Sequence, residues 1–227
     1  MGSDDLFHKI RVKTARDLAR KKEKRASYER VLIVCEGEKT EPNYFKELKD
    51  CLELNNANVE IDGNCGSSPI SVVKYAKKRC LEEKKTGDGF DKVYCVFDKD
   101  THESYDAALL EITNLKPKET FHAAHSVPCF EFWLLLHFIY TNKPYIRNGT
   151  KSSCANLIDD LKKYIPDYEK GCRDIYSKIA DNTDQAIAHS KRALSQAQTD
   201  HTDNPTTHIH KLVEYLKSLK ETEEESS

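Results

Sequence analysis

The sequence predicts an α/β fold, in which a parallel sheet is flanked by helices and followed by a C-terminal helical extension. Two observations lead to this prediction. Short runs of apolar and β-branched residues, such as VLIVC at 31–35, have the pattern of strands that are buried on both faces. These runs alternate with stretches of helical length, and such alternation is typical of parallel strands joined by right-handed crossovers.

The elements follow one another in a regular order. The first predicted strand runs into EGEKTEP, where Gly37 permits a tight turn and Thr40 with Pro42 marks a helix start. The predicted strands are 31–35, 59–61, 91–97 and 121–127. The predicted helices cover about 40–54, 69–85, 103–115, 128–140, 152–164, 175–180, 183–198 and 207–219. The run PCFEFWLLLHFIY is apolar on nearly every side, so we expect the helix at 128–140 to be buried in the core.

Length and composition fit one such core with additions. The chain has 227 residues, of which 38% are hydrophobic and 33% are charged, which indicates a heavily solvated surface. No run approaches the roughly 18 to 20 apolar residues that cross a bilayer, and the start of the chain lacks the apolar segment of a signal peptide. We therefore expect a cytoplasmic protein that binds no membrane. The expected divisions are a basic arm at 1–27, the α/β domain at 28–146, a helical extension packed on the core at 147–220, and an acidic disordered tail at 221–227.

Acidic residues follow two of the predicted strands. Glu36 and Glu38 come directly after the first strand, and Asp98 and Asp100 come directly after the third. In an open parallel sheet the active crevice lies beyond these carboxyl ends. The two aspartates of D-K-D point the same way in extended backbone, and Glu36 faces them if the two strands are neighbours. A single acid at such a place is usually an ordinary capping or loop residue, but the paired arrangement favours a site.

Three converging carboxylates repel one another unless a cation neutralises them. Oxygen ligands without His or Cys favour Mg²⁺, or Mn²⁺ in its place, so Glu36, Asp98 and Asp100 are the predicted metal ligands. A metal held in this way suits phosphoryl transfer, because it polarises the phosphate and lowers the pKa of a bound water. Lys39 is expected to balance charge at the scissile phosphate.

Glu131 is a further candidate, because it stands inside the apolar run FEFWLLLHF. A carboxylate is expensive to bury unless it is paired, protonated or bound to metal. Two readings stay open: a fourth catalytic acid, with or without a second metal, and a structural glutamate that faces His137 or a helix end. We expect His137 itself to be a core histidine with its hydrogen bonds made.

Other motifs argue against several classes of protein. The eight cysteines include no C-x-x-C pair, and Cys35 and Cys95 lie in strand-like runs, so we expect reduced, buried cysteines and no structural zinc. The H-A-A-H sequence at 122–125 lies in a segment that is predicted to be extended, with no glutamate to complete a metalloprotease motif. No Walker A or G-x-G-x-x-G sequence is present, which argues against nucleotide hydrolysis or dinucleotide binding.

The formal net charge of −2 hides an asymmetry at the two ends of the chain. Ten Lys or Arg stand against three acids between Lys9 and Arg30, whereas four glutamates follow from residue 221. The basic arm is either a contact for nucleic acid phosphates, with salt-sensitive binding, or a solvated helical face.

Four segments together resemble the RloB-like family: VLIVCEGEKTEPNYF, VFDKD, SVPCFEFWLLLHF and NPTTHIHKLVEYL. They occur in the family's order and span nearly the whole chain from about residue 28. The resemblance implies a TOPRIM fold, in which a glutamate after the first strand and a D-x-D after the third bind Mg²⁺. Those positions are Glu36, Asp98 and Asp100 here. The sequence departs from many TOPRIM enzymes in its short D-K-D-T-H, and it has no topoisomerase tyrosine context, zinc ribbon or helicase region.

The resemblance also implies a biological role. RloB-like proteins are associated with restriction loci and with abortive-infection defence against phage, typically beside an AAA or ABC-type ATPase. A related TOPRIM effector cleaves tRNA. By analogy we expect a Mg²⁺-dependent endonuclease that acts on RNA such as tRNA, or on DNA, as an antiviral effector gated by an ATPase partner.

Two readings from other classes remain. The chain could be a non-catalytic scaffold or sensor for a defence ATPase, which would be indifferent to metal. It could also be a nucleic-acid-binding module that works through the basic arm. The C-terminal helices could cover the sheet, contact substrate or form an oligomer.

Overall fold

The structure is a computed structural model that describes residues 29–54, 58–86, 89–100 and 102–225. The predicted basic arm at 1–27 lies outside these residues. None of the helices in the described ranges combines the length and apolar character that a bilayer crossing needs.

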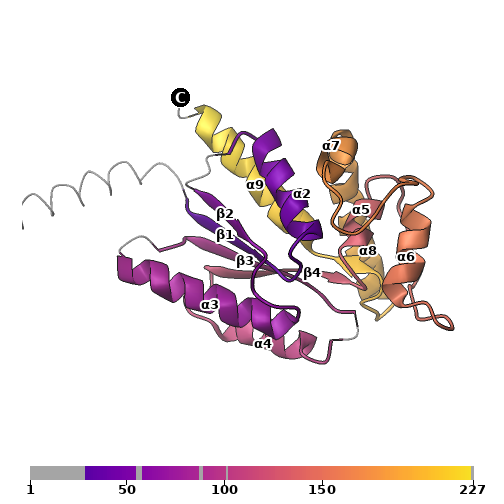
Figure 1. Cartoon of the computed structure of the whole chain (residues 1–227), viewed down its shortest axis with the longest axis horizontal. Coiled ribbons are helices and arrows are strands. Elements are labelled where there is room, and N and C mark those ends of the chain that lie inside the picture. The colour runs from indigo at the N-terminus through magenta and orange to yellow at the C-terminus, as the bar shows by residue number, and fades with distance from the viewer. Residues whose placement is uncertain (1–28, 55–57, 87–88, 101, 226–227) are drawn as a thin grey trace, which may run out of the picture.

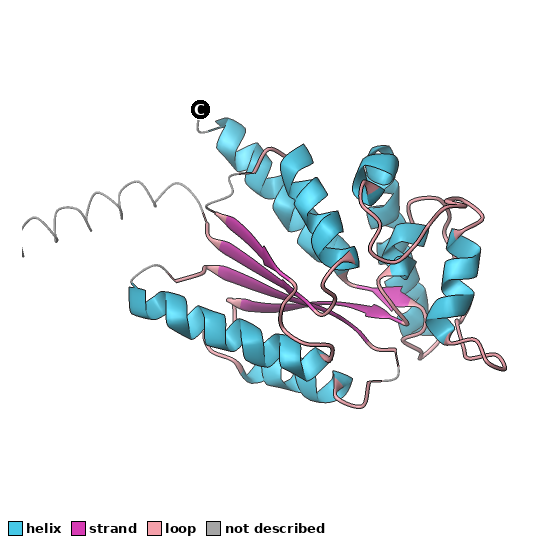
Figure 2. Cartoon of the chain, in the orientation of Figure 1, coloured by secondary structure: helices cyan, strands magenta, loops and turns pink. Residues whose placement is uncertain are grey.

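A five-stranded sheet forms the centre of the molecule (Figures 1 and 2). Its strand order is β2-β1-β3-β4-β5, in which the first four strands are parallel and β5 is antiparallel to β4. The strands are β1 (Val31–Cys35), β2 (Val59–Asp62), β3 (Lys92–Asp98), β4 (Phe121–Val127) and β5 (Thr206–Thr207). This mostly parallel sheet confirms the predicted α/β fold and is consistent with a TOPRIM-like fold.

Helices cover both faces of the sheet. Figure 1 shows α3 and α4 on one face and α2 with α9 on the other, whereas α5 to α8 gather beyond one end of the strands. The helices are α2 (Thr40–Cys51), α3 (Pro69–Thr86), α4 (Tyr105–Asn114), α5 (Glu131–Leu135), α6 (Ser153–Leu161), α7 (Ile175–Ile179), α8 (Thr183–Thr199) and α9 (Ile209–Glu225), with a 3-10 turn at Ala180–Asn182.

Strand β1 is apolar at every position because both of its faces are buried. Val31, Ile33 and Cys35 pack into one hydrophobic core, and Leu32 and Val34 pack into the other. Alternate side chains of a strand point to opposite faces, so a strand covered on both sides must be apolar throughout. The first of these cores also contains residues of the C-terminal helices, which confirms that the extension packs on the sheet.

The structure corrects three details of the sequence prediction. The buried run at 128–140 is helical only over Glu131–Leu135, because an apolar pattern reports burial and does not locate a helix end. The predicted helical extension contributes a strand, β5, to the edge of the sheet. The last helix continues to Glu225, so the acidic tail that we expected to be disordered is helical over 221–225.

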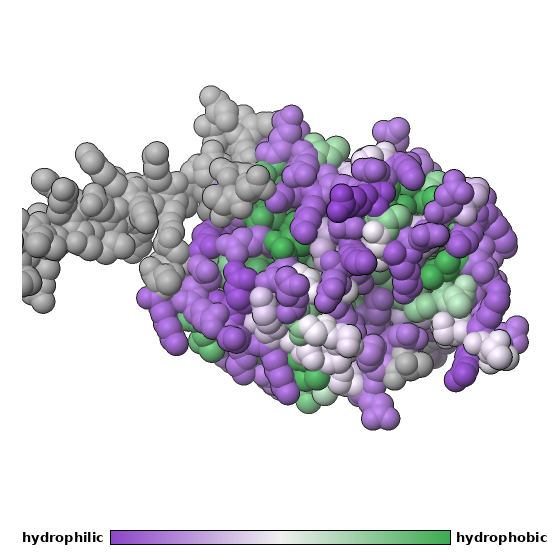
Figure 3. All heavy atoms as spheres, in the orientation of Figure 1, coloured by the Kyte–Doolittle hydropathy of each residue, from purple (hydrophilic) through white to green (hydrophobic). Residues whose placement is uncertain are grey.

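Hydrophilic residues cover most of the face of the molecule that Figure 3 shows. Cys35 and Cys95 are fully buried in adjacent strands, as predicted. All eight cysteines of the chain are free thiols.

A glutamate of helix α2 caps the N-terminus of helix α7. The Glu47 carboxylate of α2 accepts hydrogen bonds from the backbone N–H groups of Asp174, at 2.6 Å, and of Tyr176, at 2.8 Å. It therefore replaces the N-cap side chain that α7 lacks. We expect Glu47→Ala to lower the free energy of unfolding by about 1 to 2 kcal/mol, the usual cost of losing a cap. Urea denaturation would measure this loss, with Asp50→Ala, a change of an exposed acid in the same helix, as the control. Equal denaturation midpoints for the two variants would contradict the capping role of Glu47.

His137 is fully buried, and only one of its ring nitrogens is bonded among the described residues. Nδ1–H donates to the carbonyl of Trp133 at 3.0 Å, and Nε2 has no partner, so the expectation that His137 has its hydrogen bonds made is wrong for Nε2. Burial lowers the pKa of His137 to about 4. Between about pH 6.5 and pH 4, His137 is therefore protonated in the unfolded chain but neutral in the folded protein. The free energy of unfolding falls as the pH is lowered through this range. His137 alone would lower the free energy of unfolding by up to about 1.4 kcal/mol for each pH unit in this range.

We expect His137→Asn to flatten this pH dependence, because asparagine does not titrate there. Urea denaturation of both proteins at several pH values in this range would measure it. Equal pH slopes would show that His137 is not responsible.

Candidate active site

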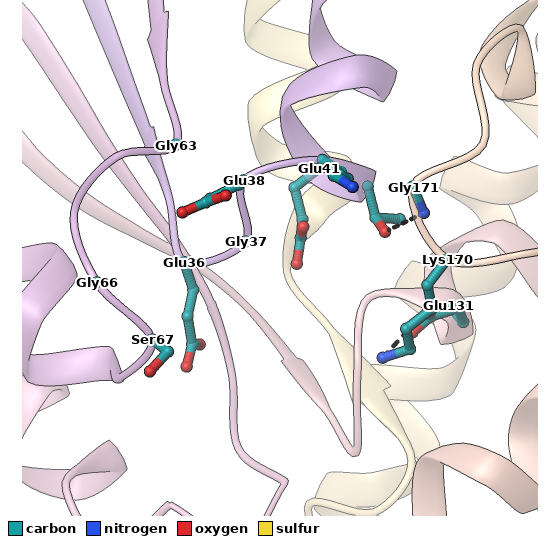
Figure 4. Close-up of a pocket in the computed structure, with 12 residues that line it drawn as sticks. Glu36, Gly37, Glu38, Glu41, Gly63, Gly66, Ser67, Glu131, Lys170 and Gly171 are labelled. Carbon is teal, nitrogen blue, oxygen red and sulfur yellow. Dashed lines mark hydrogen bonds and ion pairs between the residues drawn. The ribbon is translucent and has the colours of Figure 1, made fainter.

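A cavity of about 560 Å³ lies beyond the carboxyl ends of β1 and β2, next to the start of α5. The strand order reverses between β1 and β3, because β2 lies on one side of β1 and the later strands lie on the other. Ligands of open α/β sheets bind at such a switch point. The lining comes from the loops after β1 and β2, the first turns of α2 and α5, and the segment before α7: Glu36, Gly37, Glu38, Lys39, Thr40, Glu41, Gly63, Gly66, Ser67, Glu131, Lys170 and Gly171 (Figure 4).

Glu36 joins the ends of β1 and β3. Its backbone N–H donates to the carbonyl of Val96 at 2.9 Å, and its carboxylate accepts the backbone N–H of Asp98 at 3.1 Å. Its other oxygen lies 3.2 Å from Nε2 of His102. Burial raises the pKa of Glu36, the Asp98 N–H and His102 oppose this rise, and Asp100 adds to it. The prediction that Glu36 stands beside the D-K-D sequence is therefore confirmed.

The two aspartates of D-K-D do not form the extended pair that we predicted. Strand β3 ends at Asp98, and Asp100 has a positive φ of 28° with its N–H bonded to the carbonyl of Pro128 at 3.0 Å. The chain turns between them, so the alternation of an extended strand does not apply. Asp98 is half-buried, whereas Asp100 is exposed.

Asp98 lies among other acids. Its pKa is raised well above its usual range, first by burial and then by the charges of Glu41 and Glu131, while the N–H of Phe130 lowers it. Asp98 is thus in electrostatic contact with the deeper acids of the site, and Asp100 acts on Glu36.

Glu41 belongs to the site, although the sequence analysis missed it. This buried residue in the first turn of α2 lines the cavity, and Figure 4 shows its side chain pointing the same way as that of Glu36. Burial raises the pKa of Glu41 to about 7, its own backbone N–H opposes this, and Glu131 adds to it. A Cβ at Gly37 would come within 2.4 Å of Oε2 of Glu41, so a larger residue there would displace the Glu41 carboxylate. Its position in the first turn of the helix that follows Glu36 is the feature of the sequence that could have identified Glu41 as a site residue.

Glu131 is buried at the start of α5, with 1% of its surface exposed. The hydroxyl of Tyr168 donates to its Oε1 at 2.9 Å, and Nζ of Lys170 lies 3.4 Å from the same oxygen. The suggestion that Glu131 faces His137 is therefore wrong, because both of its partners come from the segment before α7. Glu131 is itself the first residue of α5.

Two lysines line the cavity. Lys39 is exposed, and its aliphatic stem packs against Gly171, where a Cβ would come within 2.8 Å of the Lys39 Cβ. Lys170 was not predicted. Burial alone would lower the pKa of Lys170, but Glu131 and more distant acids raise it above its usual value, so Lys170 is a cation at neutral pH.

The donors of this site suit a hard cation. Glu36, Asp98, Asp100 and Glu41 offer carboxylate oxygens, and burial with mutual repulsion raises the pKa of Glu36, Asp98 and Glu41. A divalent cation would relieve that repulsion, and an oxygen donor set fits Mg²⁺ or Mn²⁺ better than zinc. As the side chains stand, no three His, Cys, Asp or Glu among the described residues are close enough to hold an ion. The residues thus fit the metal by the chemistry of their oxygen donors and not by the present distances between them.

Comparison with known proteins identifies one relationship. A family model described as RloB-like protein matches residues 31–216, from the start of β1 into α9. This match includes every residue of the site. A search of curated proteins and a search of solved structures each gave no match.

Proposed function

The chain belongs to the RloB-like family, and from this membership together with its carboxylate site we propose that it is a metal-dependent endonuclease that cleaves nucleic acid phosphodiesters. One observation supports the proposal above the others. Glu36, which lines the cavity at the end of β1, accepts a hydrogen bond from the backbone N–H of Asp98 at the end of the neighbouring parallel strand β3; Asp98 and Asp100 are not among the residues that line the cavity. Such a site suits phosphoryl transfer, in which positioning and charge neutralisation supply most of the catalysis.

Glu36, Asp98 and Asp100 are the residues that would hold Mg²⁺ or Mn²⁺. A bound ion would polarise the phosphate and lower the pKa of the attacking water. The protein's own contribution is to orient these ligands. The N–H of Asp98 fixes one oxygen of Glu36, and the N–H of Phe130 acts on Asp98. Glu41 offers a further carboxylate in the cavity, and a bound cation would favour its charged form, which burial and Glu131 disfavour.

Hydrolysis at such a site forms a bond between the water oxygen and phosphorus as the bond from phosphorus to the leaving oxygen breaks. The water's proton passes to solvent, and the leaving oxygen gains a proton. We propose RNA such as tRNA as the favoured substrate and DNA as the alternative, in an effector of abortive-infection defence that is gated by an AAA or ABC-type ATPase. The family resemblance supports these finer assignments, and it does so by analogy.

The test is cleavage by the purified full chain. Total tRNA and plasmid DNA are incubated separately with the protein in Mg²⁺, in Mn²⁺ and in EDTA, and the products are resolved on gels. We expect cleavage with either metal and none in EDTA. Cleavage that persists in EDTA would contradict the metal site. No cleavage of either substrate, together with no binding of Mg²⁺ or Mn²⁺ by calorimetry, would favour the scaffold for a defence ATPase.

A further inference from the structure

Lys170 reaches the carboxylate site from a distant part of the chain. It lies between α6 and α7, and it lines the same cavity as Glu36 and Glu41. Its side chain is 56% exposed, so its ammonium group is accessible from the cavity while it contacts buried Glu131 (Figure 4). A lysine has three N–H donors, and the contact with one carboxylate oxygen leaves others for a ligand.

The backbone next to Lys170 is fixed to helix α2. The N–H of Gly171 donates to Oγ1 of Thr40 at 2.9 Å, and Nδ2 of Asn43 donates to the carbonyl of Gly171 at 3.1 Å. Gly171 has a positive φ of 81° and packs on the stem of Lys39, so a side chain there would be strained and would clash. These contacts tie the segment to the helix that begins the site.

The other side of the segment is fixed to α5. Tyr168 is 1% exposed, and its hydroxyl donates to the Glu131 oxygen that also lies 3.4 Å from Nζ of Lys170. One buried carboxylate therefore orients both side chains. Glu131 is the natural counterion of this lysine, because a buried carboxylate is costly unless it is paired.

We propose that Lys170 is a catalytic residue that binds a non-bridging oxygen of the scissile phosphodiester, and that Glu131 and Tyr168 are positioning residues for it. The inference rests on the proposed function and deepens it. A phosphodiester is an anion, and it must approach a cavity that Glu36, Glu38 and Glu41 make acidic. A fixed cation opposite those acids offsets the repulsion and stabilises the charge that develops on the phosphate oxygens.

This assignment bears on two expectations drawn from the sequence. Lys39 was expected to balance charge at the phosphate; it lines the same cavity with its stem against Gly171, and that role stays a prediction. Glu131 was expected either to be a fourth catalytic acid or to be structural. In the proposed arrangement it holds Lys170 and binds no metal.

The first test is cleavage kinetics with Lys170→Met, Lys170→Arg and Tyr168→Phe. We expect Lys170→Met to lower kcat about 100-fold or more, as when one transition-state donor is lost, and Lys170→Arg to retain part of the activity. Tyr168→Phe should lower kcat about tenfold, which is typical of losing a group that orients another. Lys178→Met, an exposed lysine of α7, is the matched control and should cleave like the wild type.

The second test does not depend on cleavage. Binding of a short fluorescein-labelled single-stranded RNA is measured at several salt concentrations in the Asp98→Asn background, with and without Lys170→Met. Loss of one phosphate contact should weaken binding and reduce the slope of log K against log salt by about 0.7. Lys178→Met in the same background should leave the slope unchanged.

The outcomes separate the two proposals. If Lys170→Met cleaves and binds like the Lys178→Met control, the role of Lys170 is overturned. If Met and Arg at position 170 are equally inactive while both fold, a charge-based role is also overturned. If the wild type does not cleave with any metal, the nuclease proposal fails, and the salt slope alone decides whether Lys170 contacts phosphate.

Discussion

Replacing Asp98 by Asn is expected to remove metal-dependent cleavage, by roughly 10³-fold or more, in a protein that stays folded. The carboxylate would lose the charge that a divalent cation requires, while the amide keeps the size of the side chain. The N–H of Asp98 would still bond to Glu36, because that contact uses the backbone. The effect is measured under saturating Mg²⁺ on whichever substrate, tRNA or plasmid DNA, the wild type cleaves. Activity within tenfold of the wild type would contradict the assignment of Asp98 as a ligand.

The same variant should be more stable than the wild type without metal. Burial, Glu41 and Glu131 raise the pKa of Asp98 in the folded protein, so the charged carboxylate disfavours folding at neutral pH. Asn removes that cost. Mg²⁺ should raise the Tm of the wild type, because it binds only the folded state, and should raise the Tm of the variant less. Asp106→Asn, an exposed acid in the first turn of α4, is the control and should behave like the wild type in both assays.

Trp133→Ala is expected to lower the free energy of unfolding by about 3 to 5 kcal/mol, the usual cost of removing a buried Trp. Trp133 is fully buried in α5, and its indole N–H donates to the hydroxyl of Tyr44 at 2.8 Å. The Tyr44 ring packs edge to face on Phe130 and Tyr176, so this contact joins α2, α5 and α7 beneath the site. The substitution leaves both a cavity and an unpaired buried hydroxyl.

Urea denaturation followed by far-UV circular dichroism measures this effect, because Trp133 is the only tryptophan and its fluorescence is lost in the variant. Leu110→Ala in α4 is the control. Leu110 is 63% exposed, and its truncation should change stability by about 0.5 kcal/mol or less. Similar losses in the two variants would show that the contact between α2 and α5 does not stabilise the fold.

The sequence by itself determined the parts of this protein that depend on local pattern. The strand limits at Val31–Cys35 and Phe121–Val127 agree with the prediction. At Val31–Cys35 this is because a strand buried on both faces leaves a continuous apolar run. It also determined that Glu36 and Asp98 meet. Parallel strands end at one edge, so acids that directly follow neighbouring strands come together there.

Only the tertiary structure decided the rest of the site. The turn at Asp100 depends on a hydrogen bond to Pro128, and no pattern within D-K-D encodes that partner. Lys170 and Tyr168 reach Glu131 because Thr40 and Asn43 of α2 hold the backbone of Gly171 in place. The contacts of Gly171 with Thr40 and Asn43 join segments more than a hundred residues apart in the chain. Neither periodicity nor spacing specifies such pairings, because they depend on how the C-terminal segments pack against the finished sheet.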